Sequence, residues 1–454
     1  MQNQSNSNNH DPNISGPVDV VLIYPYFYTH ASKAMLFHPL GIAQLAAILR
    51  GLGLSTQVMD CTFKHRDEVI STVIAARPRI VGIYAMLSMS KNALSLAGAI
   101  REDLPGTFLA CGGPLPTLKP ELFSAAFDAV FCGEADVSFP HFCRDYVQTT
   151  IVPDRLAPWI KNPEHYPGIY VHHPVDNTVI RSTPRSSDKT AMDRLLIPDR
   201  MDYDHLNYQQ FWHEREEASL ASIMTSYGCP FDCDFCSKPV FGHHLRLRDM
   251  DRIFEEIHDI KDRGYTGLWI ADDCFSLDPV HTRCFCKRLI SEKLDMTWVC
   301  LSRVDRISPS DIALWQASGC RKVFFGLESG NNDILKLMNK KTTIEDAEKT
   351  IKLFAQSDIQ TAGFFIVGYP GETYETIENT FEWALSLPLD EVSFTIPYPL
   401  PGTRLFDRVM PVDTQRDWTY ENENTLVFKS DFDEEFLKNR IDDVYKQFQA
   451  RAGK

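Results

Sequence analysis

Three cysteines lie close together in the stretch "YGCPFDCDFCSKP", residues 227–239. Cys229, Cys233 and Cys236 form a C-x3-C-x2-C spacing. Cysteine thiolates bind metals in such spacings, and a structural zinc site usually closes with four ligands, often from two C-x2-C pairs. The sequence has only one C-x2-C pair. The stretch therefore predicts a metal site that is one protein ligand short.

The fourth ligand has three candidate sources. His243 or His244 would complete a zinc site of the Cys3His type. Cys274 would complete an iron–sulfur cluster, because ferredoxin-like clusters use four cysteines. Alternatively, three thiolates hold a 4Fe–4S cluster and leave one iron open. An open metal position is where a substrate or cofactor binds.

Composition narrows the class of protein. The chain has 454 residues and a formal net charge of −15. At about 100–200 residues per domain it should form two or three domains. The negative charge argues against a nucleic-acid partner, since phosphate binding relies on Lys and Arg. No stretch approaches the ~20 apolar residues of a membrane span. The N-terminus lacks the basic and apolar segments of a secretory signal, so we expect a cytoplasmic protein with reduced cysteines.

Short apolar runs alternate with helical patterns across residues 17–150, after a lead of residues 1–16 that we expect to be disordered. The runs are nearly all apolar, as in a parallel sheet buried on both faces; they are "VDVVLI", "STQVMD", "RIVGIYA", "TFLACGG" and "DAVFCGE". Repeated strand–helix units predict a doubly wound, Rossmann-like α/β domain. A ligand of such a sheet sits outside the carboxyl ends of its strands.

The alternation resumes in residues 219–408. Its strand candidates are "LASIMTS", "GLWIADD", "TWVCLSR", "KVFFGLES", "TAGFFIVG" and "EVSFTIP". Six strand–helix units predict a partial (β/α)6 barrel, whose active site should lie at the carboxyl ends of the strands. The cysteine stretch directly follows the first strand, so it should lie at the barrel mouth. Residues 151–218 read as a linker with one hairpin, and residues 409–454 as a small C-terminal extension near the substrate pocket.

The cysteine loop at the end of a first barrel strand, with aromatic Phe235 before the last cysteine, resembles the radical S-adenosylmethionine (radical SAM) superfamily. The resemblance implies that Cys229, Cys233 and Cys236 hold a 4Fe–4S cluster. The amino and carboxylate groups of S-adenosylmethionine would then bind the open iron, and electron transfer would generate a 5′-deoxyadenosyl radical.

The later strand ends carry the motifs "ADDCFS", "FFGLESG" and "GFFIVGYPGET", in the order that this family shows. By the resemblance, residues from these ends bind S-adenosylmethionine. The implied contacts are Phe235, Asp273, Ser302, Glu328, Phe365 and Gly368.

The N-terminal domain is similar to the cobalamin-binding domain that precedes the barrel in one large radical SAM class. The similarity rests on "HPLGIAQLAAILRGLG", "LACGGPLPTLKPELF" and "FDAVFCGEADVSF". It implies cobalamin contacts at the strand ends: Tyr24, Ser88, Gly112, Gly113, Pro114, Gly133 and Glu134. Many cobalamin domains carry a D-x-H-x-x-G loop whose histidine binds cobalt. His30 and His38 do not fit that pattern, so either cobalt binds without a histidine or the domain has become a docking surface.

These resemblances imply a cobalamin-dependent radical SAM methyltransferase. Methylcobalamin would supply a methyl group to an unactivated carbon of a small-molecule substrate after hydrogen abstraction. A flavodoxin or ferredoxin system would reduce the cluster. One alternative is a cyclase or ring-rearranging enzyme acting on a tetrapyrrole or natural product, and the non-enzymatic alternative is an iron–sulfur carrier or redox sensor. The sequence does not identify the substrate.

Overall fold

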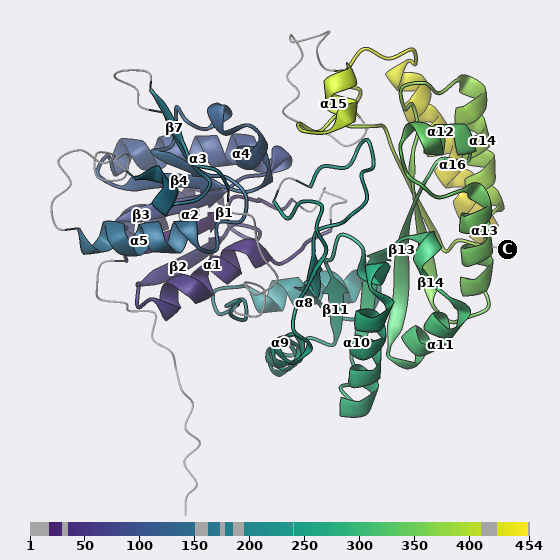
Figure 1. Ribbon diagram of the computed structural model, residues 1–454, viewed down its shortest axis with the longest axis horizontal. Coiled ribbons are helices and arrows are strands. Elements are labelled where there is room, and N and C mark those ends of the chain that lie inside the picture. Colours follow the sequence, from purple (N-terminus) through teal and green to yellow (C-terminus); the bar gives the residue numbers. More distant parts are fainter. Residues whose placement is uncertain are drawn as a thin grey trace, which may run out of the picture.

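The computed structural model describes residues 18–29, 35–149, 162–172, 178–184, 195–238, 240–409 and 425–452. These residues form two α/β units that lie side by side (Figure 1). The N-terminal unit contains one sheet, and the C-terminal unit contains a second sheet with a two-stranded ribbon at its mouth. The predicted fold class is confirmed.

The N-terminal sheet has the order β2-β1-β3-β4-β5-β6-β7. Its first five strands run parallel, as the sequence predicts. The strands are β1 (Val20–Tyr24), β2 (Thr56–Asp60), β3 (Ile80–Tyr84), β4 (Phe108–Gly112), β5 (Ala129–Phe131), β6 (Ile169–His172) and β7 (Val179–Arg181). β6 and β7 form the predicted hairpin, and β6 pairs antiparallel with β5. The hairpin therefore belongs to this sheet and does not run free between the domains.

Helices cover both faces of this sheet, because its strands are apolar on both sides. They are α1 (Leu40–Gly51), α2 (Arg66–Ala76), α3 (Ser90–Asp103), α4 (Pro114–Leu118) and α5 (Ser138–Gln148). Leu22 packs with α1 and α5 on one face. Val21 packs with α2 and α3 on the other. The alternation along β1 thus builds two cores, as expected for a doubly wound domain.

The C-terminal sheet has six parallel strands in the order β15-β14-β13-β12-β11-β8. They are β8 (Leu220–Ile223), β11 (Gly267–Ile270), β12 (Thr297–Ser302), β13 (Cys320–Glu328), β14 (Gln360–Ile366) and β15 (Glu391–Thr395). The outer helices are α9 (Met250–Asp262), α10 (Pro279–Glu292), α11 (Pro309–Ala317), α12 (Asn332–Leu337), α13 (Ile344–Phe354) and α14 (Tyr374–Ser386). This is the predicted partial barrel.

Local sequence explains why these helices form where they do. α9 begins after Asp249, whose carboxylate caps the backbone N–H groups of its first turn. Its apolar residues recur at helical spacing and face the sheet: Ile253, Phe254, Ile257 and Ile260. α13 starts with a capping box between Thr343 and Asp346.

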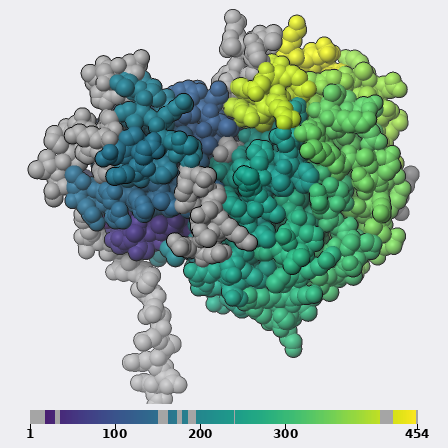
Figure 2. All heavy atoms as spheres, in the orientation of Figure 1, coloured from purple at the N-terminus to yellow at the C-terminus, as the bar shows by residue number. Residues whose placement is uncertain are grey.

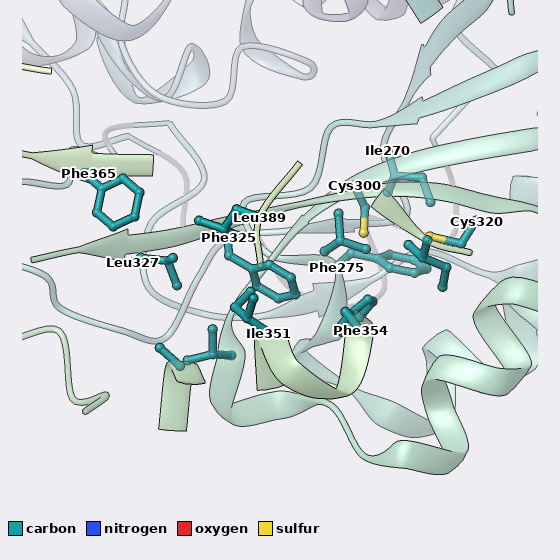
Figure 3. Packing of buried hydrophobic residues seen from close by; sticks show 14 of the residues in the cluster. Ile270, Phe275, Cys300, Cys320, Phe325, Leu327, Ile351, Phe354, Phe365 and Leu389 are labelled. Atoms are coloured by element: carbon teal, nitrogen blue, oxygen red, sulfur yellow. The ribbon is translucent and has the colours of Figure 1, made fainter. Parts of the chain in front are cut away.

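The barrel has one core outside its strands and another inside. The outer core packs strand residues such as Phe325 and Cys300 against helix residues such as Ile351 and Phe354 (Figure 3). The inner core packs Trp269 against Trp212 of α8 (His205–Glu216), which lies in the segment predicted to be a linker. Leu36 of the N-terminal unit also enters this inner core. The two units therefore share part of their packing.

The C-terminal segment forms α15 (Arg404–Val409) and α16 (Glu434–Ala452). α16 lies along α14 and β15. α15 lies above the junction between the two units (Figure 2). There Lys119, just beyond α4, approaches the ring of Phe406 at 5.7 Å. Among the described residues, no helix is both long enough and apolar enough to cross a membrane.

Candidate active site between the two domains

The three cysteines occupy the loop between β9 (Ser226–Tyr227) and β10 (Arg246–Leu247), just beyond β8. Cys229 and Cys233 are partly buried and Cys236 is exposed. Gly228 has φ +81°, and a Cβ there would lie 2.4 Å from the carbonyl oxygen of His244. Glycine at this position lets the loop fold tightly at the mouth. The predicted location of the cysteines is therefore observed.

Asp234, between the second and third cysteines, anchors the loop. Its backbone N–H donates to the Met338 carbonyl at 2.9 Å. Its buried carboxylate accepts hydrogen bonds from the Tyr369 hydroxyl and from the guanidinium of Arg408. The backbone N–H of Leu405 donates to its carbonyl at 3.0 Å. Asp234 thus connects the loop to the ends of α12 and β14 and to α15. The spacing of the cysteines in the sequence does not indicate these contacts.

Phe231 and Arg303 hold the other side of the loop. The Arg303 guanidinium lies 3.7 Å from the centre of the Phe231 ring, in a cation–π contact. Arg303 also donates to the carboxylate of Asp305 at 2.9 Å and to the carbonyl of Lys340 at 3.0 Å. The residue after β12 therefore connects the cysteine loop to the segment after α12.

Glu328, at the end of β13, is one of the predicted S-adenosylmethionine contacts. Its carboxylate accepts a hydrogen bond from the ammonium of Lys340 at 2.6 Å, and both side chains are buried. Burial would lower the pKa of Lys340, but Glu328 and Cys233 outweigh burial and raise it. Glu328 also has φ +66°, unusual for a residue with a side chain. Lys340 is a further mouth residue, and no sequence motif marks it.

The other predicted contacts divide into residues at the mouth and residues whose side chains point elsewhere. The ring centre of Phe235 lies 6.0 Å from the Lys340 ammonium. Asp273 is exposed, and after burial its charge is one of the causes that raise the pKa of Cys229. The Ser302 hydroxyl is engaged with that of Ser276 at 2.6 Å. The side chain of Phe365 lies in the outer core (Figure 3). Its ring stacks on that of Phe394. Phe365 can therefore offer only its backbone to a ligand at the mouth.

Gly368 follows β14 with φ +84°, and its N–H donates to the Glu372 carboxylate at 2.8 Å. A Cβ at Gly368 would lie 2.8 Å from Leu437 of α16. Burial raises the pKa of Glu372 to about 7. The C-terminal helix thus packs directly behind Gly368, one of the residues predicted to contact S-adenosylmethionine.

The thiols fit a 4Fe–4S cluster better than a single metal ion. Among the described residues, no three Cys, His, Asp or Glu side chains are placed to hold one ion. A cubane cluster makes a different demand, because each of three thiolates binds its own iron. The histidines of the zinc alternative, His243 and His244, are both exposed. Cys274 is buried, with its sulfur 3.7 Å from the Ser276 hydroxyl.

A cavity of about 310 Å³ opens at the carboxyl ends of the N-terminal strands. Five of the seven predicted cobalamin contacts line it: Gly112, Gly113, Pro114, Gly133 and Glu134. Tyr24 and Ser88 do not. The Tyr24 ring lies behind the lining residue Tyr84 at 5.5 Å, and Ser88 is exposed. Gly113 has φ +119°, and a Cβ there would lie 2.4 Å from the carbonyl oxygen of Ala85.

The barrel completes the wall of this cavity. Residues on both sides of the cysteine loop line it, namely Tyr227, Val240 and Phe241. The guanidinium of Arg246 in β10 donates two hydrogen bonds, of 3.0 and 2.5 Å, to the carboxylate of Glu134. The loop that carries the cysteines thus borders the cavity that carries the predicted cobalamin residues. Glycines at strand ends and an apolar wall fit a large organic cofactor.

A buried charge cluster lies at the same junction. Glu256 is within 2.5 Å of Arg200 and 2.7 Å of Arg248, and all three side chains are almost completely buried. Burial would raise the pKa of Glu256, but the two guanidinium groups lower it. Glu256 and Arg248 also line the cavity.

His38 is a structural residue of the junction. Its ring accepts a hydrogen bond from the N–H of Ser222 at 3.3 Å and lies 2.8 Å from the Tyr265 hydroxyl. Burial, followed by the charge of Arg200, lowers its pKa. His30 lies outside the described residues. The described residues that line the cavity include no histidine.

Comparison with known proteins agrees with this geometry. Residues 223–384 match the family model of the radical SAM superfamily, and residues 31–142 match that of the B12 binding domain. The chain therefore belongs to the radical SAM superfamily and carries a B12 binding domain ahead of its radical SAM domain. It is an enzyme of the cobalamin-dependent class, and its cofactors are a 4Fe–4S cluster, S-adenosylmethionine and cobalamin. These predictions are confirmed.

Two relatives show the range of activities within this class. An uncharacterized methyltransferase of Pyrococcus horikoshii is 29% identical over 378 residues, which cover 81% of this chain and 78% of the relative. An anaerobic magnesium-protoporphyrin IX monomethyl ester cyclase of Rubrivivax gelatinosus is 26% identical over 442 residues, covering 94% of this chain and 77% of the relative. The radical SAM methyltransferase TsrM of Kitasatospora setae, solved with cobalamin and a 4Fe–4S cluster, has a similar fold. Its TM-score is 0.72 at 18% identity, over 86% of this chain and 74% of TsrM.

Proposed function

We propose that the protein transfers a methyl group to a carbon atom of a small-molecule substrate. The observation that carries the proposal is the shared wall between the cysteine loop and the cobalamin cavity, with Tyr227 and Phe241 on that wall. When bound, the cluster with S-adenosylmethionine supplies the radical, and cobalamin carries the methyl group. The two must work on one substrate, and a common wall holds them within reach of it.

The residues of the chain have three roles in this proposal. Cys229, Cys233 and Cys236 hold the cluster, and Asp234 holds their loop. Phe235, Asp273, Ser302, Glu328 and the backbone of Phe365 to Gly368 bind S-adenosylmethionine, with Lys340 orienting Glu328. The strand-end residues Gly112, Gly113, Pro114, Gly133 and Glu134 bind cobalamin, with Tyr24 and Ser88 outside the cavity. A low-potential flavodoxin or ferredoxin reduces the cluster.

One relative of this chain is a methyltransferase whose name gives a small-molecule substrate. A cytidylyl-2-hydroxyethylphosphonate methyltransferase of Streptomyces wedmorensis is 24% identical over 424 residues. The similarity to the Rubrivivax gelatinosus cyclase favours a second candidate, a ring-forming reaction on the same two domains. Domain layout does not separate the two reactions, but their by-products do.

The test is an anaerobic incubation of the reconstituted protein with reductant and S-adenosylmethionine, followed by mass spectrometry. Methyl transfer predicts two products: 5′-deoxyadenosine, and S-adenosylhomocysteine that forms only when cobalamin is bound. A cyclase predicts 5′-deoxyadenosine without S-adenosylhomocysteine. Absence of both products from protein that holds all three cofactors would contradict the proposed function.

A further inference from the structure

Asp234 places a buried negative charge directly beside the proposed cluster ligands. It lies between Cys233 and Cys236, and only 9% of its side chain is exposed. A buried carboxylate is unfavourable unless hydrogen bonds and an opposite charge compensate it. Its Oδ2 atom accepts hydrogen bonds from the Tyr369 hydroxyl and from the Arg408 guanidinium. Of these two partners, Arg408 is the one that carries a positive charge.

Arg408 comes from α15, which is not an element of the barrel. The same helix makes two further contacts with the cysteine loop. The N–H of Leu405 donates to the Asp234 carbonyl at 3.0 Å, and the guanidinium of Arg404 pairs with the carboxylate of Asp232. The loop between the first and last cysteine contains these two aspartates and no basic residue. A guanidinium of α15 therefore pairs with each acid of the loop.

Burial separates the two ion pairs. The side chains of Arg404 and Asp232 are 60% and 45% exposed, so water and salt screen their charges. The Asp234 carboxylate is buried, and Arg408 also donates to the Tyr369 hydroxyl at 2.9 Å. This second hydrogen bond fixes the guanidinium against the carboxylate. The pair of Arg408 and Asp234 is therefore the one whose charges act strongly within the loop.

The charge of this pair matters for the chemistry of the loop. The reduction potential of a 4Fe–4S cluster depends on the net charge, the hydrogen bonds and the solvent exposure around it. Three thiolates already make the site negative, and reduction adds one electron from the low-potential donor. A nearby carboxylate disfavours that electron, and a guanidinium that neutralises the carboxylate removes this penalty. Loss of Arg408 would leave the charge of Asp234 uncompensated.

We propose that Arg408 is a positioning residue of the cluster site: it neutralises Asp234 and thereby raises the reduction potential of the cluster that the adjacent cysteines hold. The inference rests on cluster binding by these cysteines, which is part of the proposed function, and not on the identity of the reaction. It gives α15 a role in electron transfer to the cluster.

The experiment measures the midpoint potential of the cluster in the full-length, reconstituted protein without S-adenosylmethionine. The readout is a dithionite titration with redox mediators, followed by electron paramagnetic resonance. A unit charge within about 10 Å shifts such an equilibrium on the order of tenfold at an effective dielectric constant of about 20. Arg408→Met should therefore lower the midpoint potential by about 59 mV, the equivalent of tenfold for one electron.

Two partner variants separate the effect of charge from damage to the fold. Asp234→Asn removes the negative charge and should raise the midpoint potential by a similar amount. The double variant removes both charges and should return close to the unmodified value. Arg408→Lys keeps the positive charge and should retain both the cluster and its potential. Iron and sulfide content shows whether each variant holds the cluster.

Arg440→Met is the matched control. Arg440 is a partly buried residue of α16 that donates to the carboxylate of Glu378 in α14 at 2.7 Å, away from the cysteine loop. Its substitution should leave the potential unchanged. If Arg408→Met does not retain the cluster, the rise in Asp234→Asn and the unchanged potential of Arg408→Lys carry the test.

The remaining outcomes overturn the proposal. Unchanged potentials in the single variants, or shifts of both in the same direction, would exclude compensation of the Asp234 charge. Loss of the cluster in Arg408→Lys would show that the shape of the guanidinium matters and not its charge. An equal shift in Arg440→Met would show that the effect is not specific to the loop. Failure of the unmodified protein to bind a cluster would overturn cluster binding itself, a result distinct from the others.

Discussion

Arg246 and Glu134 join the two domains through two parallel hydrogen bonds of 3.0 and 2.5 Å. Arg246 belongs to the ribbon that brackets the cysteine loop, and Glu134 belongs to a strand end of the cobalamin domain. The exposed fractions of their side chains are only 5% and 12%. One ion pair thus ties the position of the cluster loop to the position of the cobalamin cavity.

Glu134→Gln should loosen the junction. The substitution removes the negative charge that pairs with the buried Arg246 guanidinium, which costs about 2–4 kcal/mol for pairs of this kind. A lower midpoint of urea unfolding and faster proteolysis would show the effect. Glu348→Gln removes an exposed partner of Lys352 and serves as the control, with an expected change below about 0.5 kcal/mol. Equal effects of the two substitutions would contradict the role of the junction pair.

Cys229→Ala, Cys233→Ala and Cys236→Ala should each abolish the cluster, because each thiolate binds a separate iron. Cys274→Ser should retain it, since S-adenosylmethionine and not Cys274 completes the site. Iron and sulfide content and the electron paramagnetic resonance (EPR) signal of the reduced protein measure the outcome. Loss of the cluster in Cys274→Ser would instead support a four-cysteine carrier.

The losses of stability caused by Glu328→Gln and Lys340→Met should be strongly non-additive. Each single change leaves one buried charge unpaired, at a cost of about 3–5 kcal/mol, whereas the double variant leaves none. Unfolding midpoints of the three variants test the coupling. If Glu328 contacts S-adenosylmethionine, calorimetric titration of the reconstituted protein should also show weaker binding in Lys340→Met. Additive losses of stability would refute the buried pair.

Glu372→Gln should change how stability depends on pH. Burial raises the pKa of Glu372 to about 7, above its usual range near 4.5. Because the folded state holds the proton more tightly, its contribution is fully present below about pH 4.5 and is lost as pH rises through 7. The stability of the variant relative to the unmodified protein should therefore rise by about 1–3 kcal/mol between pH 5 and pH 8. A difference that is flat across this range would rule out the shift.

Gly113→Ala should distort the backbone at the wall of the cavity. The new Cβ would lie 2.4 Å from the Ala85 carbonyl oxygen, on a backbone with φ +119°. Strain of about 1–3 kcal/mol and weaker cobalamin binding are expected. Gly98→Ala in α3 is the control, because its added Cβ meets nothing within 4 Å. Cobalamin affinity and thermal midpoints compare the two.

Local patterns predicted the architecture but not the contacts between distant segments. The spacing of Cys229 to Cys236 and the apolar runs of each strand are short-range signals, so the cluster loop and both sheets could be predicted. Arg246 and Glu134 are 112 positions apart, and Arg408 and Asp234 are 174 apart. No periodicity marks such pairs, because tertiary packing alone brings them together.

Sequence motifs also do not indicate in which direction a side chain points. Phe365 lies in a predicted binding motif, yet the alternation along β14 turns its ring toward the outer helices. Lys340 follows Glu328 by twelve positions and carries no motif of its own. α8 falls in the segment predicted to be a linker, although its aromatic residues fill the inside of the barrel.

The central claim is that the cluster and cobalamin meet at the common wall beside Tyr227 and Phe241. EPR spectroscopy of protein that holds both cofactors tests it most directly. If the claim holds, reduction of the cluster should broaden or split the cob(II)alamin signal, and Cys233→Ala should abolish that change. Cob(II)alamin and reduced-cluster signals that simply superimpose in the unmodified protein would contradict it.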